Sequence, residues 1–187
     1  MRLGMIGLGR MGANMVRRLM ADGHECVVHD VTVEPIEVLA AEGASPAPRL
    51  EELVAALEPP RHVWIMIPAA YVGATVERLA PLLSPGDTIV DGGNSWYRHA
   101  VDRSADLRQR FEVDFVDVGT SGGVHGLERG YCLISAGRRK RSNGCPRSSR
   151  HWRPAPPPPR GHRAGRATRC PRSTAGCTAG GRVPVTS

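Results

Sequence analysis

The first 137 residues predict an α/β fold built on a doubly wound parallel sheet. Three observations support this prediction. Short apolar runs alternate with segments whose apolar residues recur at helical spacing, which is the rhythm of repeated βαβ units. The run at residues 62–68 is apolar at nearly every position, as expected of a strand buried on both faces. A glycine-rich turn joins the first apolar run to the first helical segment.

The first strand is predicted at residues 2–6 and stops at Gly7. The next segment is predicted to be a helix that ends at Gly23, because its apolar residues follow helical spacing. A second strand at residues 25–30 ends in an acid. Together these elements form one βαβ unit.

The same alternation continues to residue 123. Further helices are predicted at residues 34–43, 50–57, 72–83 and 98–110, and further strands at residues 62–68, 86–93 and 113–123. Ligands of doubly wound sheets bind beyond the carboxyl ends of the strands. The loops after the strands are therefore the candidate site.

The turn after the first strand has the pattern GxGxxG, formed by Gly7, Leu8, Gly9, Arg10, Met11 and Gly12. In a Rossmann-type fold the first glycine allows a tight turn and the second lets the backbone approach a pyrophosphate. The third lets helix and strand pack closely. The position between a strand and a helix favours a dinucleotide site over a plain glycine turn.

Asp30 ends the second strand, where an acid accepts hydrogen bonds from the adenine ribose. A carboxylate there repels the 2′-phosphate of NADP, and no arginine follows within several positions. These features favour NAD over NADP. The alternative is a surface aspartate without this role.

Two later loops contain small polar residues. Asn94 and Ser95 follow two glycines after the fourth predicted strand, and they suit a carboxamide or a substrate hydroxyl. Ser121, Gly122 and Gly123 offer a hydroxyl and unhindered N–H groups to an anionic substrate. Each loop alone is also consistent with an ordinary turn.

The composition changes sharply at about residue 137. Residues 1–137 contain 12 basic and 18 acidic residues, a net charge of −6, whereas residues 138–187 contain 13 basic residues and no acid. The second segment has few large apolar residues, so it is predicted to be a disordered basic tail. Its positive charge predicts salt-dependent contact with nucleic acid without specific recognition.

Other classes of protein are disfavoured. The five cysteines lack the spacing of a zinc site or a disulfide framework, so no metal is expected. No apolar run is long enough to span a membrane, and no signal peptide is expected at the start of the chain. These features predict a cytoplasmic protein without a membrane partner.

Residues 1–137 resemble the amino-terminal domain of the decarboxylating 6-phosphogluconate dehydrogenases. The resemblance rests on three stretches in the same order: GLGRMGANMVRRL, VDGGNS and VDVGTSGGVHGLERGYCL. It implies oxidation of the C3 hydroxyl of 6-phosphogluconate by hydride transfer to the nicotinamide. Loss of carbon dioxide then gives ribulose 5-phosphate, a step of the pentose phosphate pathway. Asp30 resembles the NAD-preferring branch, since relatives that use NADP carry an Asn-Arg-Thr sequence there.

The resemblance also implies a role for each loop. The Gly7–Gly12 turn would hold the pyrophosphate and Asp30 the ribose, and the loop after the third predicted strand would line the cofactor. That loop consists of Ile67, Pro68 and Ala69. Asn94 would lie between nicotinamide and substrate, and residues 121–123 would hold the sugar acid.

The sequence departs from this family after residue 137. The family uses a downstream lysine as general base, a glutamate as acid, and a helical domain that supplies the homodimer interface. Here the only lysine is Lys140, and no acid follows Glu128. We therefore expect a truncated chain with impaired catalysis and without the family's dimer interface. A reading-frame shift explains the tail better than a natural extension.

Two alternatives stay open at this point. One is a β-hydroxyacid dehydrogenase of the 3-hydroxyisobutyrate type, which shares the Rossmann start and a similar Ser-Gly-Gly loop. The other is a non-catalytic dinucleotide-binding protein whose tail adheres to nucleic acid.

Overall fold

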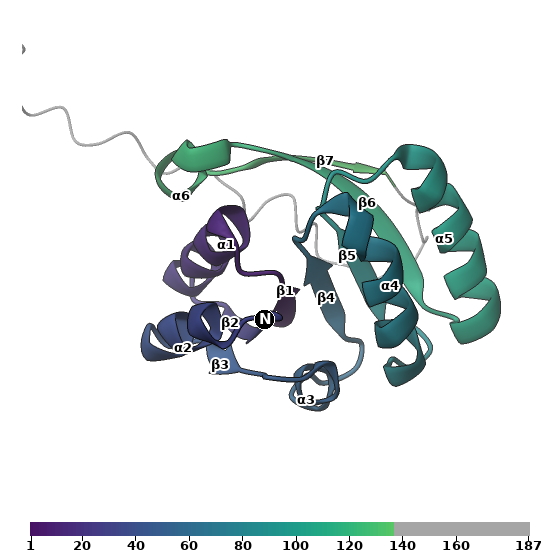
Figure 1. Cartoon of the computed structure of the whole chain (residues 1–187), viewed down its shortest axis with the longest axis horizontal. Helices are drawn as coiled ribbons and strands as arrows, with labels where there is room; N and C mark the ends of the chain where they lie inside the picture. Colours follow the sequence, from purple (N-terminus) through teal and green to yellow (C-terminus); the bar gives the residue numbers. More distant parts are fainter. Residues whose placement is uncertain (137–187) are drawn as a thin grey trace, which may run out of the picture. The chain divides into compact units, whose positions relative to one another are not determined.

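The computed structural model describes residues 1–136 and confirms the predicted α/β fold (Figure 1). The strands are β1 (Arg2–Ile6), β2 (Glu25–His29), β3 (Ser45–Pro46), β4 (His62–Ile65), β5 (Thr88–Asp91), β6 (Asp114–Ser121) and β7 (Cys132–Ala136). The helices are α1 (Arg10–Ala21), α2 (Val33–Ala41), α3 (Leu50–Ala55), α4 (Ala69–Leu79), α5 (Tyr97–Phe111) and α6 (Gly126–Arg129). Two short 3₁₀ turns are η1 (Ala80–Leu82) and η2 (Gly123–His125).

The strands form one Rossmann-like sheet in the order β3-β2-β1-β4-β5-β6-β7. Every neighbouring pair from β3 to β6 is parallel, in agreement with the predicted parallel sheet, although β3 itself was not predicted. The sequence patterns did not predict β7, which pairs antiparallel with β6 at the edge of the sheet. The chain reverses between β6 and β7 through η2 and α6, so this reversal lies in the glycine-rich loop of the candidate site.

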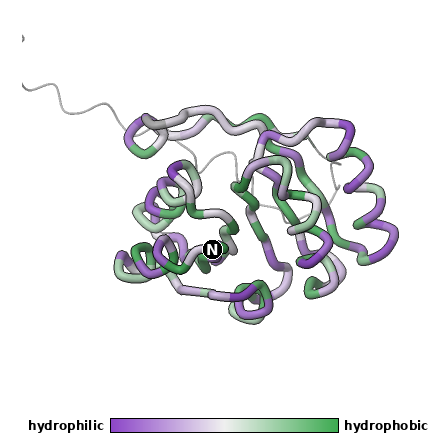
Figure 2. Tube along the Cα trace, viewed as in Figure 1, coloured by the Kyte–Doolittle hydropathy of each residue, from purple (hydrophilic) through white to green (hydrophobic). Residues whose placement is uncertain are grey.

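Two buried clusters of apolar side chains hold helices on the two faces of the sheet. The cluster under α3, α4 and α5 contains Val27, Val63 and Ile89 from the strands. The cluster under α1 and α2 contains Met5 and Val28. Alternate residues of a strand therefore face opposite clusters, which explains why the central strands read as continuous apolar runs. Figure 2 shows that the helices carry hydrophobic and hydrophilic residues together, consistent with one buried side each.

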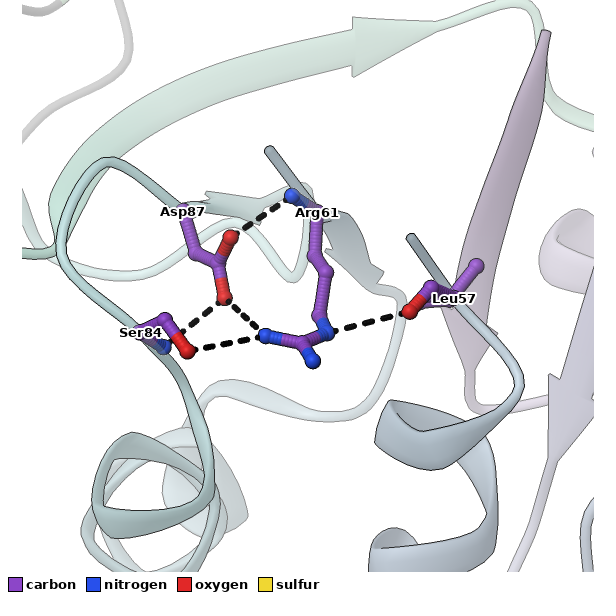
Figure 3. Close-up of polar contacts among 4 residues, drawn as sticks. All are labelled: Leu57, Arg61, Ser84 and Asp87. Atoms are coloured by element: carbon purple, nitrogen blue, oxygen red, sulfur yellow. Dashed lines mark hydrogen bonds and ion pairs between the residues drawn. The ribbon is translucent and has the colours of Figure 1, made fainter. Parts of the chain in front are cut away.

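A buried ion pair joins the amino ends of β4 and β5 (Figure 3). Asp87 is fully buried, and its carboxylate accepts the backbone N–H groups of Arg61 at 2.7 Å and Ser84 at 2.9 Å. It also accepts Nη1 of Arg61 at 3.0 Å. The Arg61 guanidinium donates further to the Leu57 carbonyl and the Ser84 hydroxyl. This network holds together the amino ends of β4 and β5, which lie opposite the carboxyl ends that carry the candidate site.

Some predictions lie outside the described residues. The predicted tail, residues 138–187, and its boundary at residue 137 belong to that part of the chain. Within residues 1–136, no helix is long and apolar enough to cross a membrane.

Candidate functional site

The strand order reverses between β1 and β4, which is where doubly wound sheets bind their ligands. Ile6 is paired with Ile65, so the two strands end side by side. The Met66 N–H donates to the Ile6 carbonyl at 2.7 Å, just past this end. The loop that begins at Gly7 and the loop that begins at Met66 therefore leave the sheet together.

The three glycines of the turn have different surroundings. Gly7 has a φ of 92°, and a Cβ atom there would lie 2.5 Å from Cγ2 of Ile67. A Cβ atom on Gly12 would overlap the Gly7 carbonyl, so α1 packs closely on the turn. Nothing lies within 4 Å of the Cβ position of Gly9. The backbone at Gly9 is thus open to a ligand, as the pyrophosphate of a dinucleotide requires.

The start of α1 suits an anion. Gly9 is the N-cap, no side chain accepts a hydrogen bond there, and the first turn contains no acidic residue. The N–H groups of a first helical turn and the helix dipole favour a negative group. Of the predicted turn residues, Arg10 is exposed and Met11 is half-buried. The turn therefore fits a diphosphate. The carboxylate of the adjacent Asp30 accepts hydrogen bonds from Leu8 and Thr32.

Asp30 is held in a fixed orientation at the end of β2. Its Oδ2 accepts the Leu8 N–H at 2.7 Å, and its Oδ1 accepts the N–H and hydroxyl of Thr32 at 3.0 and 2.9 Å. Burial alone would raise the pKa of Asp30, but the hydrogen bonds from Leu8 and Thr32 outweigh it and lower the pKa below the ordinary value. The carboxylate is therefore charged at neutral pH and lies directly beside the glycine turn.

The loop after β4 packs against this turn. Ile67 is half-buried, and its side chain fills the space that a Cβ atom on Gly7 would need. Pro68 and Ala69 are exposed at the start of α4. Gly93 is also close to this loop, because a Cβ atom there would overlap the Ile67 carbonyl. The loops after β1, β4 and β5 are thus in direct contact.

Asn94 lies on the loop after β5 in an unusual backbone conformation. Its φ is 60°, in the left-handed region that few residues other than glycine adopt, and its side chain is exposed. The hydroxyl of Ser95 is buried and has no hydrogen-bond partner among the described residues. An exposed amide beside an unsatisfied hydroxyl is consistent with a polar ligand at this loop.

A buried carboxylate supports the Asn94 loop from below. Asp91 is fully buried, and its Oδ1 accepts the Gly93 N–H at 2.9 Å. Its Oδ2 lies 3.7 Å from Nη1 of Arg103 on α5. Asp117 is paired with Asp91 on the neighbouring strand. Burial and the charge of Asp91 together raise the pKa of Asp117.

The predicted substrate loop begins at the end of β6. Ser121 is its exposed last strand residue, and Gly122 and Gly123 have φ values of 141° and 48°. Only glycine adopts the first of these without strain. Because β6 lies next to β5, this loop and the Asn94 loop are at the same edge of the sheet.

All the predicted residues lie at the carboxyl edge of the sheet, but they fall into two groups. The glycine turn, Asp30, the Ile67 loop and the Asn94 loop are linked by contacts or hydrogen bonds. The Ser121 loop contacts α1 instead, through residues that the sequence reasoning missed. Tyr131 packs against this loop, and Nη1 of Arg18 donates to the Leu127 carbonyl at 3.0 Å. No repeating pattern marks either residue: Arg18 contacts a residue 109 positions away, and Tyr131 packs on two glycines of its own loop.

Comparison with known proteins identifies the family. The protein-family model described as the NAD binding domain of 6-phosphogluconate dehydrogenase matches residues 2–145 of the sequence. The NAD(+)-dependent decarboxylating 6-phosphogluconate dehydrogenase of Haloferax volcanii is 41% identical over 138 residues, which are 73% of this chain and 45% of that protein. The 6-phosphogluconate dehydrogenase structure from Plasmodium falciparum has a TM-score of 0.66 at 28% identity, covering 72% of this chain and 30% of that chain.

A 3-hydroxyisobutyrate dehydrogenase from Mycobacterium tuberculosis shares the fold, with a TM-score of 0.65 at 23% identity over 73% of this chain and 46% of that chain. The chain thus spans less than half the length of these relatives. The family match confirms the resemblance and agrees with a nicotinamide dinucleotide as the ligand of the glycine turn. The chain belongs to the oxidoreductase family defined by the NAD-binding domain of 6-phosphogluconate dehydrogenase.

Proposed function

We propose that residues 1–136 bind NAD in preference to NADP and form part of a site that oxidises 6-phosphogluconate. The observation that supports this most is the placement of Asp30. Its ionised carboxylate is tied to the glycine turn by the Leu8 N–H at 2.7 Å, where the ribose of a dinucleotide on that turn would lie. A 2′-phosphate there would meet a fixed negative charge.

Each loop has a task in this proposal. The backbone around Gly9 and the start of α1 bind the pyrophosphate, and Asp30 accepts the ribose hydroxyls. Ile67, Pro68 and Ala69 line the path of the cofactor. Bound NAD supplies a nicotinamide ring that accepts a hydride.

The other two loops would orient the substrate. Asn94 would lie between nicotinamide and sugar acid, and its amide would donate hydrogen bonds to the substrate. The hydroxyl of Ser121 and the N–H groups of Gly122 and Gly123 bind the sugar acid, whose charge suits unhindered backbone donors. Decarboxylation to ribulose 5-phosphate completes the proposed reaction.

Turnover by this chain alone is proposed to be weak. The described residues contain no lysine, and the only lysine of the sequence is Lys140. A missing general base typically costs about 10²- to 10⁴-fold in rate. Binding of the cofactor is therefore the function to measure first.

Titrations of the full chain with NADH and NADPH test the proposal, with cofactor fluorescence as the signal. We expect NADH to bind more tightly than NADPH. Asp30→Asn should weaken the affinity for NADH by about tenfold or more, since a hydrogen bond to a charged group contributes about 1.5–3 kcal/mol. The same substitution should reduce the ratio of the NADH affinity to the NADPH affinity.

Glu42→Gln is the matched control. This variant also removes one negative charge, but that charge pairs with Arg17 on α1, whose Nε lies 2.6 Å from Oε2 of Glu42. This substitution should leave both affinities unchanged. Equal affinity of the wild-type chain for the two cofactors would refute the proposed preference, and binding of neither by folded protein would refute the proposed function.

A further inference from the structure

One buried aromatic ring shapes the loop that carries Ser121. Tyr131 is only 6% exposed. A Cβ atom on Gly126 would overlap its Cδ1, Cε1 and Cζ atoms, and a Cβ atom on Gly122 would lie 2.9 Å from Cδ1. Two glycines on either side of the 3₁₀ turn therefore rest against the same edge of the ring, and no larger residue fits at Gly126 while the ring stays in place.

The hydrogen bonds within the loop are local. The His125 N–H donates to the Gly122 carbonyl at 3.1 Å, and the Gly130 N–H donates to the Gly126 carbonyl at 2.9 Å. Such bonds close the turns η2 and α6, but they do not determine how these turns sit on the sheet. That placement depends on contacts with the rest of the domain.

Those contacts lead to the helix of the glycine turn. Tyr131 belongs to the same buried cluster as Leu8 of the turn and Met15 of α1. Arg18, also on α1, donates from Nη1 to the Leu127 carbonyl at 3.0 Å. The loop is thus held to the helix of the proposed cofactor site at two points, the ring of Tyr131 and the guanidinium of Arg18.

We propose that Tyr131 is a positioning residue, whose ring fixes the direction of the Ser121 hydroxyl and of the Gly122 and Gly123 N–H groups relative to α1. What this loop binds rests on the proposed function. The ring touches neither cofactor nor substrate in this proposal, and it acts through the two glycines that pack on it.

Hydrogen exchange of residues 120–126 in the full chain tests the proposal without any ligand. Gly126→Ala places a methyl group against the ring, and we expect the protected amides of this segment, among them the His125 N–H bonded to the Gly122 carbonyl, to exchange about tenfold faster, equivalent to about 1.4 kcal/mol. Gly119→Ala is the matched control, because its Cβ would lie 3.8 Å from the nearest atom, at ordinary contact distance. It should leave exchange unchanged.

A double-mutant comparison shows whether the ring is the cause. In a Tyr131→Leu background, Gly126→Ala should change exchange by less than about twofold, because the two substitutions act on one contact. Tyr131→Phe keeps the ring and should exchange more slowly than Tyr131→Leu. If Gly126→Ala speeds exchange equally with and without the ring, or not at all, the proposal is wrong. If Gly126→Ala does not fold, equal exchange in Tyr131→Leu and Tyr131→Phe overturns it.

Binding measurements separate this inference from the proposed function. With NADH present, 6-phosphogluconate should bind at least about tenfold more weakly to Gly126→Ala than to Gly119→Ala, while NADH affinity stays the same. An equal loss of NADH affinity would indicate general damage and contradict a positioning role. A wild-type chain that binds no 6-phosphogluconate would refute the proposed substrate, whereas the exchange results would still decide the role of Tyr131.

Discussion

Replacing Asp87 by alanine should destabilise the domain more than any exposed charge substitution. The carboxylate of Asp87 is fully buried and accepts three N–H groups, two from Arg61 and one from Ser84. Its removal leaves these donors without an acceptor and leaves the guanidinium of Arg61, 16% exposed, without its counter-charge. Breaking a buried pair in this way costs about 3–5 kcal/mol. Since small domains are stable by about 5–15 kcal/mol, the loss is a large share of the total.

The measurement is urea unfolding of the full chain, followed by circular dichroism. Asp106→Ala is the control, because Asp106 forms an exposed ion pair with Arg110 at 3.0 Å, one helical turn away. Such pairs contribute about 0.3–0.5 kcal/mol. A loss below about 1 kcal/mol for Asp87→Ala, or equal losses for the two variants, would refute the energetic reasoning. Under conditions where Asp87→Ala is folded, its NADH affinity should equal that of the wild type, because Asp87 lies at the opposite edge of the sheet.

Three further predictions concern the turn and the cysteines. Burial raises the pKa of Cys26 to about 11, so iodoacetamide at pH 8 should modify the exposed Cys132 and spare Cys26 in the native protein; equal labelling by peptide mass spectrometry would contradict this. Gly12→Ala should lower the unfolding free energy by about 1–3 kcal/mol, whereas Gly9→Ala, where the added methyl group meets open space, should change it by less than about 0.5 kcal/mol yet weaken NADH binding. The pKa of Asp30 is lowered on folding, so its contribution to stability is present above the unfolded pKa of about 3.9 and is lost as the pH falls through the folded pKa. The stability difference between wild type and Asp30→Asn should therefore shrink between pH 7 and pH 3, and a difference independent of pH would contradict the assignment.

The sequence predicted the repeated βαβ units because the strands of a parallel sheet are locally apolar and the helices are locally periodic. Strand β3 escaped because two residues, Ser45 and Pro46, carry no pattern. Strand β7 was not predicted because four of its five residues are exposed, so its sequence shows no alternation of buried and exposed positions.

The same distinction holds for the site. The glycine turn and Asp30 could be singled out because GxGxxG and an acid at the end of the second strand restrict the residue type at fixed spacing, and their contact with a dinucleotide stays a prediction. Asp91, Arg18 and Tyr131 were not singled out, because each supports a loop through contacts that leave no pattern in the sequence. The contact of Arg18 joins residues 109 positions apart, while those of Asp91 and Tyr131 are local and follow no repeating pattern.

The crowding of the loops after β1, β4 and β5 has a consequence for natural and laboratory variation. At Gly7, Gly12 and Gly93 a single added carbon meets a neighbouring backbone or side chain. Substitutions at these glycines therefore disturb the main chain and cannot adjust the binding site. Val31, next to Asp30, is 93% exposed. Variants that alter cofactor choice should accumulate at residue 31, where a new side chain meets solvent, while the crowded glycines stay as they are.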